Sequence, residues 1–337
     1  MNEQKNLRFF GIGKILPFLR PFRKQLLVMM IFGLISSGTD ILLPLFQRYA
    51  LDHFVVQKTL DTIWVFTAAY FLTYCLAGVV NYISCTLATV IEVQVSRDMR
   101  HAAFSHLQKL SFSYFNQNSV GYIHARLMSD TSRIGTLVSW TLIDSIWRIS
   151  YLVGSVAVML YMNTRLALMV LTIVPLLVVL FAIFQKKLIR VNREIREVNS
   201  QITANFNEGI TGAKTVKSLG VEEKMENRFQ ADTHTMKTKS VKASRLRGLF
   251  AGTMNFASSV AIAIVLWKGG YIASEEVGLF SVFMSYAQGM MEPLRWLVDI
   301  VSDLITTQVN IERFTGVLAV KSDVEDTPNI INRFRIC

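Results

Sequence analysis

The sequence has few of the residues that build redox, metal or disulfide sites. It contains 3 cysteines, with no CxxC pair and no metal-binding spacing, and 5 scattered histidines. A disulfide scaffold, a structural metal centre and a recognisable catalytic constellation are therefore not expected. The phosphate-binding pattern GxxxxGK[ST] is also absent from these residues. A chain that lacks this loop and its lysine does not hydrolyse ATP by the P-loop mechanism, so its status as an enzyme is left open.

Apolar residues, in contrast, are abundant and clustered. They make up 52% of the chain, and the mean hydropathy is +0.38. Six runs are long enough to cross a hydrocarbon core of about 30 Å: Leu26–Phe46, Ile63–Val90, Leu137–Tyr161, Leu166–Phe184, Leu249–Trp267 and Val277–Leu297. These runs predict an all-α protein with six transmembrane helices in the lipid bilayer.

The net charge of +11 is unevenly distributed. Segments 1–24, 97–133 and 186–247 hold 6, 5 and 14 Lys and Arg residues, whereas the alternate connections hold only four. This asymmetry is typical of the positive-inside rule. It predicts a multi-pass protein of the cell (plasma) membrane with both termini cytoplasmic, and it argues against a nucleic-acid partner.

The two cytoplasmic connections are long and helical in pattern. They cover about residues 91–136 and 185–248, and apolar residues of the second recur at steps of three and four from Leu188 to Phe206. We therefore expect spans two to five to continue as helices, projecting roughly 30 Å beyond the bilayer.

The N-terminal residues 1–24 interleave aromatic and aliphatic side chains with basic ones. This pattern favours an amphipathic elbow segment in the membrane interface, broken by Pro17 and Pro21. A solvated basic tail is the alternative.

The inner turns carry a family resemblance. The first reads LSFSYFNQNSVGYIHARLMSDTSRI over residues 110–134, with an aromatic pair, a polar turn, a glycine and then R-L-x-x-D-x-x-x-I. The second reads FNEGITGAKTVKSLGVEEKMENRF over 206–229, with E-x-x-x-G-x-x-x-V-K-S. With the opening ILPFLRPFRKQLL and the closing VNIERFTGVLAVKSDVEDTPN, they resemble the transmembrane domain of six-helix (type I) ABC exporter half-transporters of the multidrug or lipid exporter kind.

The resemblance implies a type 1 transmembrane domain over 25–312 and a linker over 313–337 toward a nucleotide-binding domain. That domain would bind ATP and Mg²⁺, and its LSGGQ signature does not occur in this sequence. We expect it to have been removed by truncation or frameshift, rather than to lie on a separate polypeptide. The resemblance further implies a homo- or heterodimer that exports an amphipathic or hydrophobic substrate. The alternatives are a non-functional or regulatory fragment and an ATP-independent polytopic transporter.

The resemblance also places a short coupling helix at each inner turn, docked on the nucleotide-binding domain. The residues expected there are Tyr114, Phe115, Asn118, Gly121, Arg126, Asp130, Glu208, Gly212, Val216, Lys217 and Ser218. The aromatic pair offers large anchors, and Gly121 and Gly212 would permit sharp reversals. Ion pairs of Asp130 with Arg126 and Arg133 would add a few tenths of a kcal/mol each. The same residues could instead only cap and solvate a helical turn.

Polar and methionine residues inside the predicted spans are the second set of candidates. Charged groups there should face the bundle interior or water. The residues assigned to a translocation path are Asp40, Asp144, Arg148, Met284, Met291, Glu292 and Arg295. Structural pairing of the charges and simple helix packing of the methionines are equally compatible with the sequence. Pro293 predicts a kink in span six.

Overall fold

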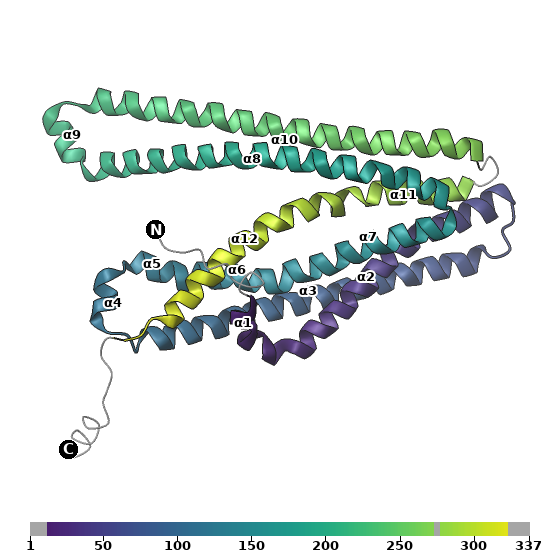
Figure 1. Ribbon diagram of the computed structural model, residues 1–337, viewed down its shortest axis with the longest axis horizontal. Coiled ribbons are helices and arrows are strands. Elements are labelled where there is room, and N and C mark those ends of the chain that lie inside the picture. Colours follow the sequence, from purple (N-terminus) through teal and green to yellow (C-terminus); the bar gives the residue numbers. More distant parts are fainter. Residues whose placement is uncertain (1–11, 273–276, 323–337) are drawn as a thin grey trace, which may run out of the picture. The chain divides into compact units, whose positions relative to one another are not determined.

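The computed structural model describes residues 12–272 and 277–322, and every regular element in these ranges is a helix (Figure 1). Three helices run far past the predicted spans: α3 (Ile63–Leu107), α8 (Thr164–Thr211) and α10 (Glu222–Ile272), with 45, 48 and 51 residues. At 1.5 Å per residue they are about 70 to 75 Å long, more than twice the thickness of a hydrocarbon core. The all-α prediction and the helical extensions are confirmed.

The chain forms two compact units. Unit 2 is Met159–Val298, and unit 1 combines the segments before and after it. Besides α3 and the later part of α12 (Met291–Ala319), unit 1 contains α1 (Ile12–Leu19), η2 (Arg20–Phe22), α2 (Arg23–Tyr49), η3 (Ala50–Val56), α4 (Phe112–Gln117), α5 (Val120–His124), η4 (Ala125–Asp130), α6 (Thr131–Thr136), η5 (Leu137–Thr141) and most of α7 (Leu142–Met162).

Unit 2 is built on a long antiparallel helix pair. Its elements are α8, α9 (Ala213–Leu219), α10, α11 (Val277–Gly289) and the start of α12. Helices α8 and α10 pack side by side along much of their length and are joined at one end by α9 (Figure 1). Lys239 on α10 pairs with Glu194 on α8 at 3.4 Å, and Arg247 donates to Asn192 at 3.3 Å.

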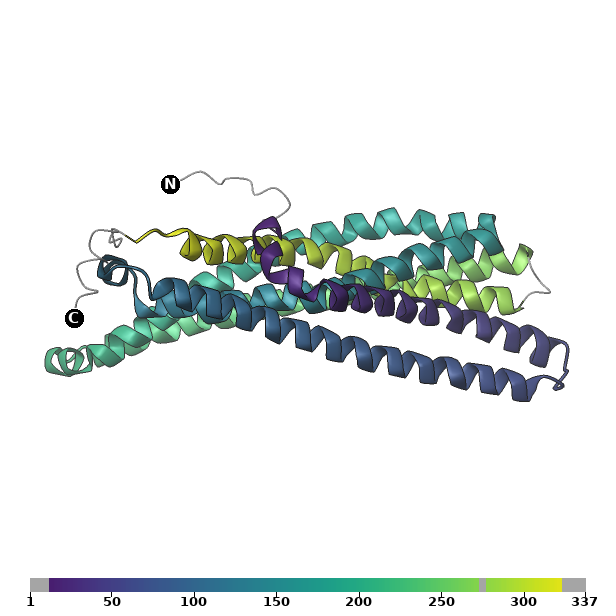
Figure 2. The ribbon, with the colours of Figure 1, turned by 90° about the horizontal axis from the view of Figure 1, so that it is seen from below.

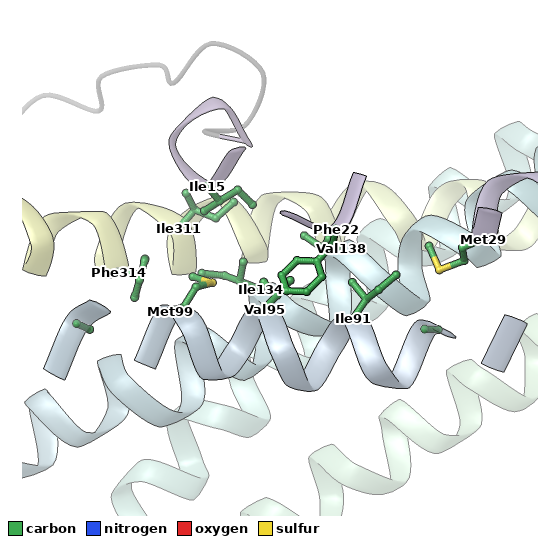
Figure 3. Close-up of a cluster of buried hydrophobic side chains, with 12 residues drawn as sticks. Ile15, Phe22, Met29, Ile91, Val95, Met99, Ile134, Val138, Ile311 and Phe314 are labelled. Carbon is green, nitrogen blue, oxygen red and sulfur yellow. The ribbon is translucent and has the colours of Figure 1, made fainter. Parts of the chain in front are cut away.

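Unit 1 is organised around one face of α3, beside which α2 runs in both views (Figures 1 and 2). Residues of α3 that recur at steps of three and four are buried: Ala88, Ile91, Val95, Met99 and Ala103. They pack in one cluster with Ile134 of α6, Val138 of η5, and Ile311 and Phe314 of α12 (Figure 3). Val95 and Met99 lie beyond the predicted span, where an unburied side chain would be exposed to water. Burial of each therefore stabilises the fold by about 1.5–3 kcal/mol.

A polar contact fixes the register between α3 and the helix that follows the first inner turn. Glu92 accepts hydrogen bonds from Thr136 Oγ1 at 2.7 Å and from Trp140 Nε1 at 2.8 Å. Gly135 makes the close approach possible, because a β-carbon there would overlap the Ser96 hydroxyl and lie 3.0 Å from the Glu92 carbonyl oxygen. The inner ends of these helices are therefore joined by both polar contacts and close packing.

Three helical segments of the described residues are long and apolar enough to cross a membrane: Gly13–Val56, Ile63–Leu107 and Val120–Met162. They contain the first three predicted spans. The other three runs lie in α8, α10 and α11–α12, and the count of six spans stays a prediction.

Two proline predictions have different outcomes. The prediction that Pro17 breaks the first helix is wrong, because Pro17 lies inside α1, where it removes only the hydrogen bond that an N–H at this position would donate to the Gly13 carbonyl. The chain changes direction at η2, which contains Pro21. Near Pro293, α11 ends at Gly289 and α12 begins at Met291, because Pro293 has no N–H to donate to the Gly289 carbonyl; the kink itself stays a prediction.

The predicted terminal segments are only partly covered. Residues 1–11 of the elbow segment and 323–337 of the linker lie outside the described residues. The described part of the elbow is not a free tail, since Ile15 is buried and Phe18 packs edge-to-face on Phe314 with ring centroids 6.0 Å apart. The predicted linker begins inside α12, whose Val317 is also buried.

Candidate coupling turns and polar cavity

The first inner turn consists of two short helices, α4 and α5 (Figure 1). The extended residues Asn118 and Ser119 separate them. The Asn118 amide donates to the Tyr114 carbonyl at 2.9 Å and ends α4, while the Ser119 hydroxyl accepts the Tyr122 N–H at 3.2 Å and starts α5. Ser119 was not among the predicted site residues, although a serine before an apolar helical turn is an N-cap signal.

Large apolar side chains of this turn face solvent. Phe112 is 87% exposed, Val120 84% and Phe115 43%. Tyr114 is half-buried, and burial, with Tyr122 as a second cause, raises the pKa of its hydroxyl. The predicted anchor pair is thus divided in role: Phe115 is available to a partner, whereas Tyr114 belongs to the turn itself. The most exposed anchor, Phe112, was missed because it precedes the aromatic pair that carries the family pattern.

Behind the exposed surface lies an ion pair that sequence reasoning undervalued. Arg126 Nη1 and Asp130 Oδ2 are 2.7 Å apart, and their side chains are only 12% and 5% exposed. The guanidinium also lies 4.5 Å from the centre of the Tyr122 ring. Burial lowers the pKa of Arg126, but the hydrogen bond to Asp130 and the contact with Tyr122 outweigh it and raise the pKa. This buried pair joins the two ends of the π-helical turn η4.

The second predicted partner of Asp130 is not observed. No ion pair joins Asp130 to Arg133 among the residues that the structure describes, and that prediction is wrong. Arg133 instead lines a cavity with Asp303 of α12. Burial, together with the nearby Asp299, raises the pKa of Asp303. The aspartate 3 residues before Arg133 is already committed to Arg126, which explains the difference.

The second inner turn contains α9. Gly212 precedes it, donating to the Glu208 carbonyl at 2.8 Å and accepting the Val216 N–H at 2.9 Å. Lys217 and Ser218 are exposed, as are the large apolar residues Ile210 (61%) and Leu219 (68%) near the ends of α9. This turn, like the first, presents apolar anchors on a short helix.

The two glycines predicted to permit sharp reversals have different outcomes. The prediction for Gly121 is wrong, because it lies inside α5 with open space around it. Gly212 separates α8 from α9 with an ordinary φ of −89°, and a β-carbon there would lie only 2.9 Å from the Glu208 carbonyl oxygen. Gly220, which was not predicted, ends α9 with φ 61°. A glycine directly after a short helical pattern is a C-cap signal, so Gly220 could have been found from the sequence.

Polar residues of three helices line a cavity of about 510 Å³ at the depth of the predicted spans in unit 1. Asp40 of α2 accepts a hydrogen bond from Trp147 Nε1 at 2.7 Å. Asp144 lies 3.9 Å from Arg148, whose guanidinium is 5.3 Å from the Trp147 ring centre. Asp40 and Asp144 both line the cavity, while Arg148 stands beside it.

The other four predicted path residues belong to unit 2. Met284 and Met291 are half-buried, and Glu292 and Arg295 are exposed. The Arg295 guanidinium lies 5.6 Å from the centre of the Phe250 ring on α10. Two carboxylates and an adjacent arginine are thus brought together in unit 1.

Comparison with known proteins adds a family match. The family model described as the ABC transporter transmembrane region matches residues 26–294. An uncharacterised ABC transporter ATP-binding protein of Bacillus subtilis (strain 168) is 24% identical over 329 residues, covering 96% of this chain and 54% of the relative.

Two further relatives have functional names. A putative multidrug export ATP-binding/permease protein of Staphylococcus aureus (strain bovine RF122 / ET3-1) is 23% identical, covering 84% of this chain and 50% of the relative. An ATP-dependent lipid A-core flippase of Syntrophus aciditrophicus (strain SB) is also 23% identical, covering 98% and 56%. The chain therefore spans about half the length of the curated relatives it matches.

Proposed function

Since this chain belongs to the family of ABC transporter transmembrane regions, we propose that it forms half of the translocation path of an ATP-driven exporter. Two such chains, identical or different, would enclose the path in the cell membrane with their termini in the cytoplasm. ATP and Mg²⁺ would bind to a nucleotide-binding domain that docks on the inner turns. The relatives named as a multidrug exporter and a lipid A-core flippase support an amphipathic or hydrophobic substrate.

The observation that carries the proposal is the surface of the inner turns. Each turn contains a short helix at the end of helices that continue far beyond the predicted spans. Each also exposes a large apolar side chain, Phe112 on α4 and Leu219 at the end of α9. An isolated cytoplasmic turn gains nothing from exposing such groups to water. Buried in a partner's groove they become interface anchors.

The geometry of unit 1 offers a route from the turn to the cavity. The helical run Val120–Met162 holds Asp130 near its start and Trp147 in the cavity wall, about 26 Å further along. The Arg126–Asp130 pair stiffens the beginning of this run, and Glu92 clamps its middle to α3. A displacement of α4 and α5 by a docked domain would therefore reach the cavity as a rigid-body movement.

A photo-crosslinking experiment tests the docking. The tagged full chain, carrying a photoreactive residue in place of Phe112 or Leu219, is irradiated in native membranes, and the products are identified by mass spectrometry. We expect both positions to capture a polypeptide with a nucleotide-binding domain. Trp64 at the far end of α3, which is 84% exposed, is the matched control and should capture none. Equal yields at all three positions, or products without such a domain, would contradict the proposal.

The cavity is the proposed part of the path in unit 1. Its walls combine the carboxylates of Asp40 and Asp144 with the rings of Tyr74, Trp140 and Trp147. Carboxylates favour a positively charged group, and indole faces attract cations as well as apolar surface. An amphipathic substrate with a cationic group fits this lining.

The two cysteines of α3 allow a test of water access. Cys85 lines the cavity, whereas Cys75 is exposed on the same helix outside the lining. The thiolate is the nucleophile that attacks a methanethiosulfonate, and it forms readily only where water reaches the thiol. Cys85 should therefore react at least about tenfold faster than a lipid-facing Cys75 with a charged, membrane-impermeant methanethiosulfonate. The rates are measured in membrane vesicles on variants that keep one cysteine each, with Cys337→Ser in both. Similar rates at the two positions would exclude a water-filled path here.

A further inference from the structure

A strongly basic cavity lies between α8 and α10 in unit 2, and none of its lining residues belongs to α9. It has a volume of about 760 Å³. Six of its lining residues are basic: Lys187, Arg190, His234, Lys237, Lys242 and Arg245. Its remaining lining is a threonine and the apolar residues Val191, Val241, Leu246 and Leu249, so no carboxylate contributes to the wall.

These basic residues have no anionic partners within the described part of the chain. The ion pair that does join the two helices uses Lys239 and Glu194, neither of which lines the cavity. Several like charges facing one another across a cleft repel, and the repulsion costs free energy unless an anion binds between them. The cavity is therefore suited to a negatively charged ligand.

Its position relative to the predicted spans indicates where that ligand comes from. Span four is predicted to end at Phe184 and span five to begin at Leu249. Lys187 and Arg245 then lie about 5 Å beyond the hydrocarbon core, and Arg190 and Lys242 about 10 Å beyond it. The headgroup layer is about 5–8 Å thick on each side of the core. Lys187 and Arg245 therefore lie at its depth, and the long side chains of Arg190 and Lys242 can reach back to it. Lys237, further along α10, strengthens the positive potential from outside the headgroup layer.

We propose that this cavity binds the phosphate headgroup of an anionic phospholipid from the inner leaflet. Arg190 and Arg245 supply planar guanidinium groups that hydrogen-bond phosphate oxygens in pairs. Lys187 and Lys242 add charge on the two sides of the cleft. Leu246 and Leu249 continue the lining toward the bilayer and accommodate the start of the acyl chains. The lipid thereby holds α8 and α10 together where their charges would separate them.

Binding of a tail-labelled phosphatidylglycerol to the purified full chain in neutral detergent tests this site. One variant combines four substitutions in the cavity: Lys187→Gln, Arg190→Gln, Lys242→Gln and Arg245→Gln. We expect it to bind the lipid at least about tenfold more weakly, since each basic residue near a headgroup adds to the attraction for an anionic lipid. A matched control removes four exposed charges of α8 and α10 outside the cavity: Lys186→Gln, Arg193→Gln, Arg196→Gln and Lys224→Gln. The control should bind as the unmodified chain does, and phosphatidylcholine should not compete.

Three outcomes would overturn the proposal. Equal loss in the cavity variant and the control would mean that overall charge, and not this cavity, attracts the lipid. Unchanged binding by the cavity variant would place the lipid elsewhere. Displacement by inorganic phosphate or pyrophosphate at concentrations comparable to those of the lipid would identify a site for soluble anions, because a lipid site gains additional affinity from the acyl chains.

Discussion

Replacing Asp130 with alanine is expected to destabilise unit 1 by about 3–5 kcal/mol, the cost of leaving one member of a buried ion pair without the other. Arg126 would keep its contact with the Tyr122 ring, but its guanidinium, whose side chain is 12% exposed, would lose the carboxylate 2.7 Å away. The midpoint temperature of thermal unfolding of the purified full chain, followed through tryptophan fluorescence, should fall by roughly 10 °C.

Two further variants distinguish the effect of breaking this buried ion pair from the effect of simply losing a charge. Arg126→Met combined with Asp130→Leu removes both charges, so it should recover most of the lost stability. Asp52→Ala breaks the pair that Asp52 forms with Arg48 at the same (i, i+4) spacing, but both side chains there are 33% exposed. That variant should lose at most about 1 kcal/mol. A double variant as unstable as Asp130→Ala would refute the role assigned to the pair.

The contrast between these two pairs explains what the sequence could and could not predict. Spacing alone identifies Arg126 and Asp130 as neighbours on one helix, because that relation is local. Burial depends on elements distant in the sequence. The same holds for Glu92, whose partners Thr136 and Trp140 lie 44 and 48 residues away. The hydrogen bonds of Glu92 could therefore not be predicted from the sequence, because they depend on how the run from α5 to α7 packs on α3.

Long helices and the family were predictable for the opposite reason. Apolar periodicity and charge asymmetry are properties of single segments, and they predicted α3, α8 and α10 well beyond the membrane. The order of the inner-turn motifs predicted the family, which the match over residues 26–294 confirms. The basic cavity between α8 and α10 was harder to predict, because its lining combines residues 187–191 of one helix with residues 234–249 of another, and their pairing depends on the fold.

The largest functional effect is expected from the α4 surface. Replacing Phe112 and Phe115 with aspartate places two charges where a nucleotide-binding domain would bury apolar surface. Loss of one interface anchor costs about 2 kcal/mol or more, so association should weaken at least thirtyfold. Unfolding should be almost unaffected, because Phe112 is 87% exposed and contributes little to the fold. Tyr114 is unsuited to this test, since it is half-buried and its removal would also disturb the turn.

The association is measured by co-purification of the nucleotide-binding domain with the tagged chain from native membranes, together with substrate-stimulated ATP hydrolysis after reconstitution. Phe104→Asp is the matched control: the residue lies on α3 before the turn and is 54% exposed. If α4 is the docking surface, the control still co-purifies with the nucleotide-binding domain and still shows substrate-stimulated ATP hydrolysis, whereas the double variant loses both. Retention of both by the double variant would refute docking at α4, and loss of both in the control would show that any added charge on these inner helices suffices.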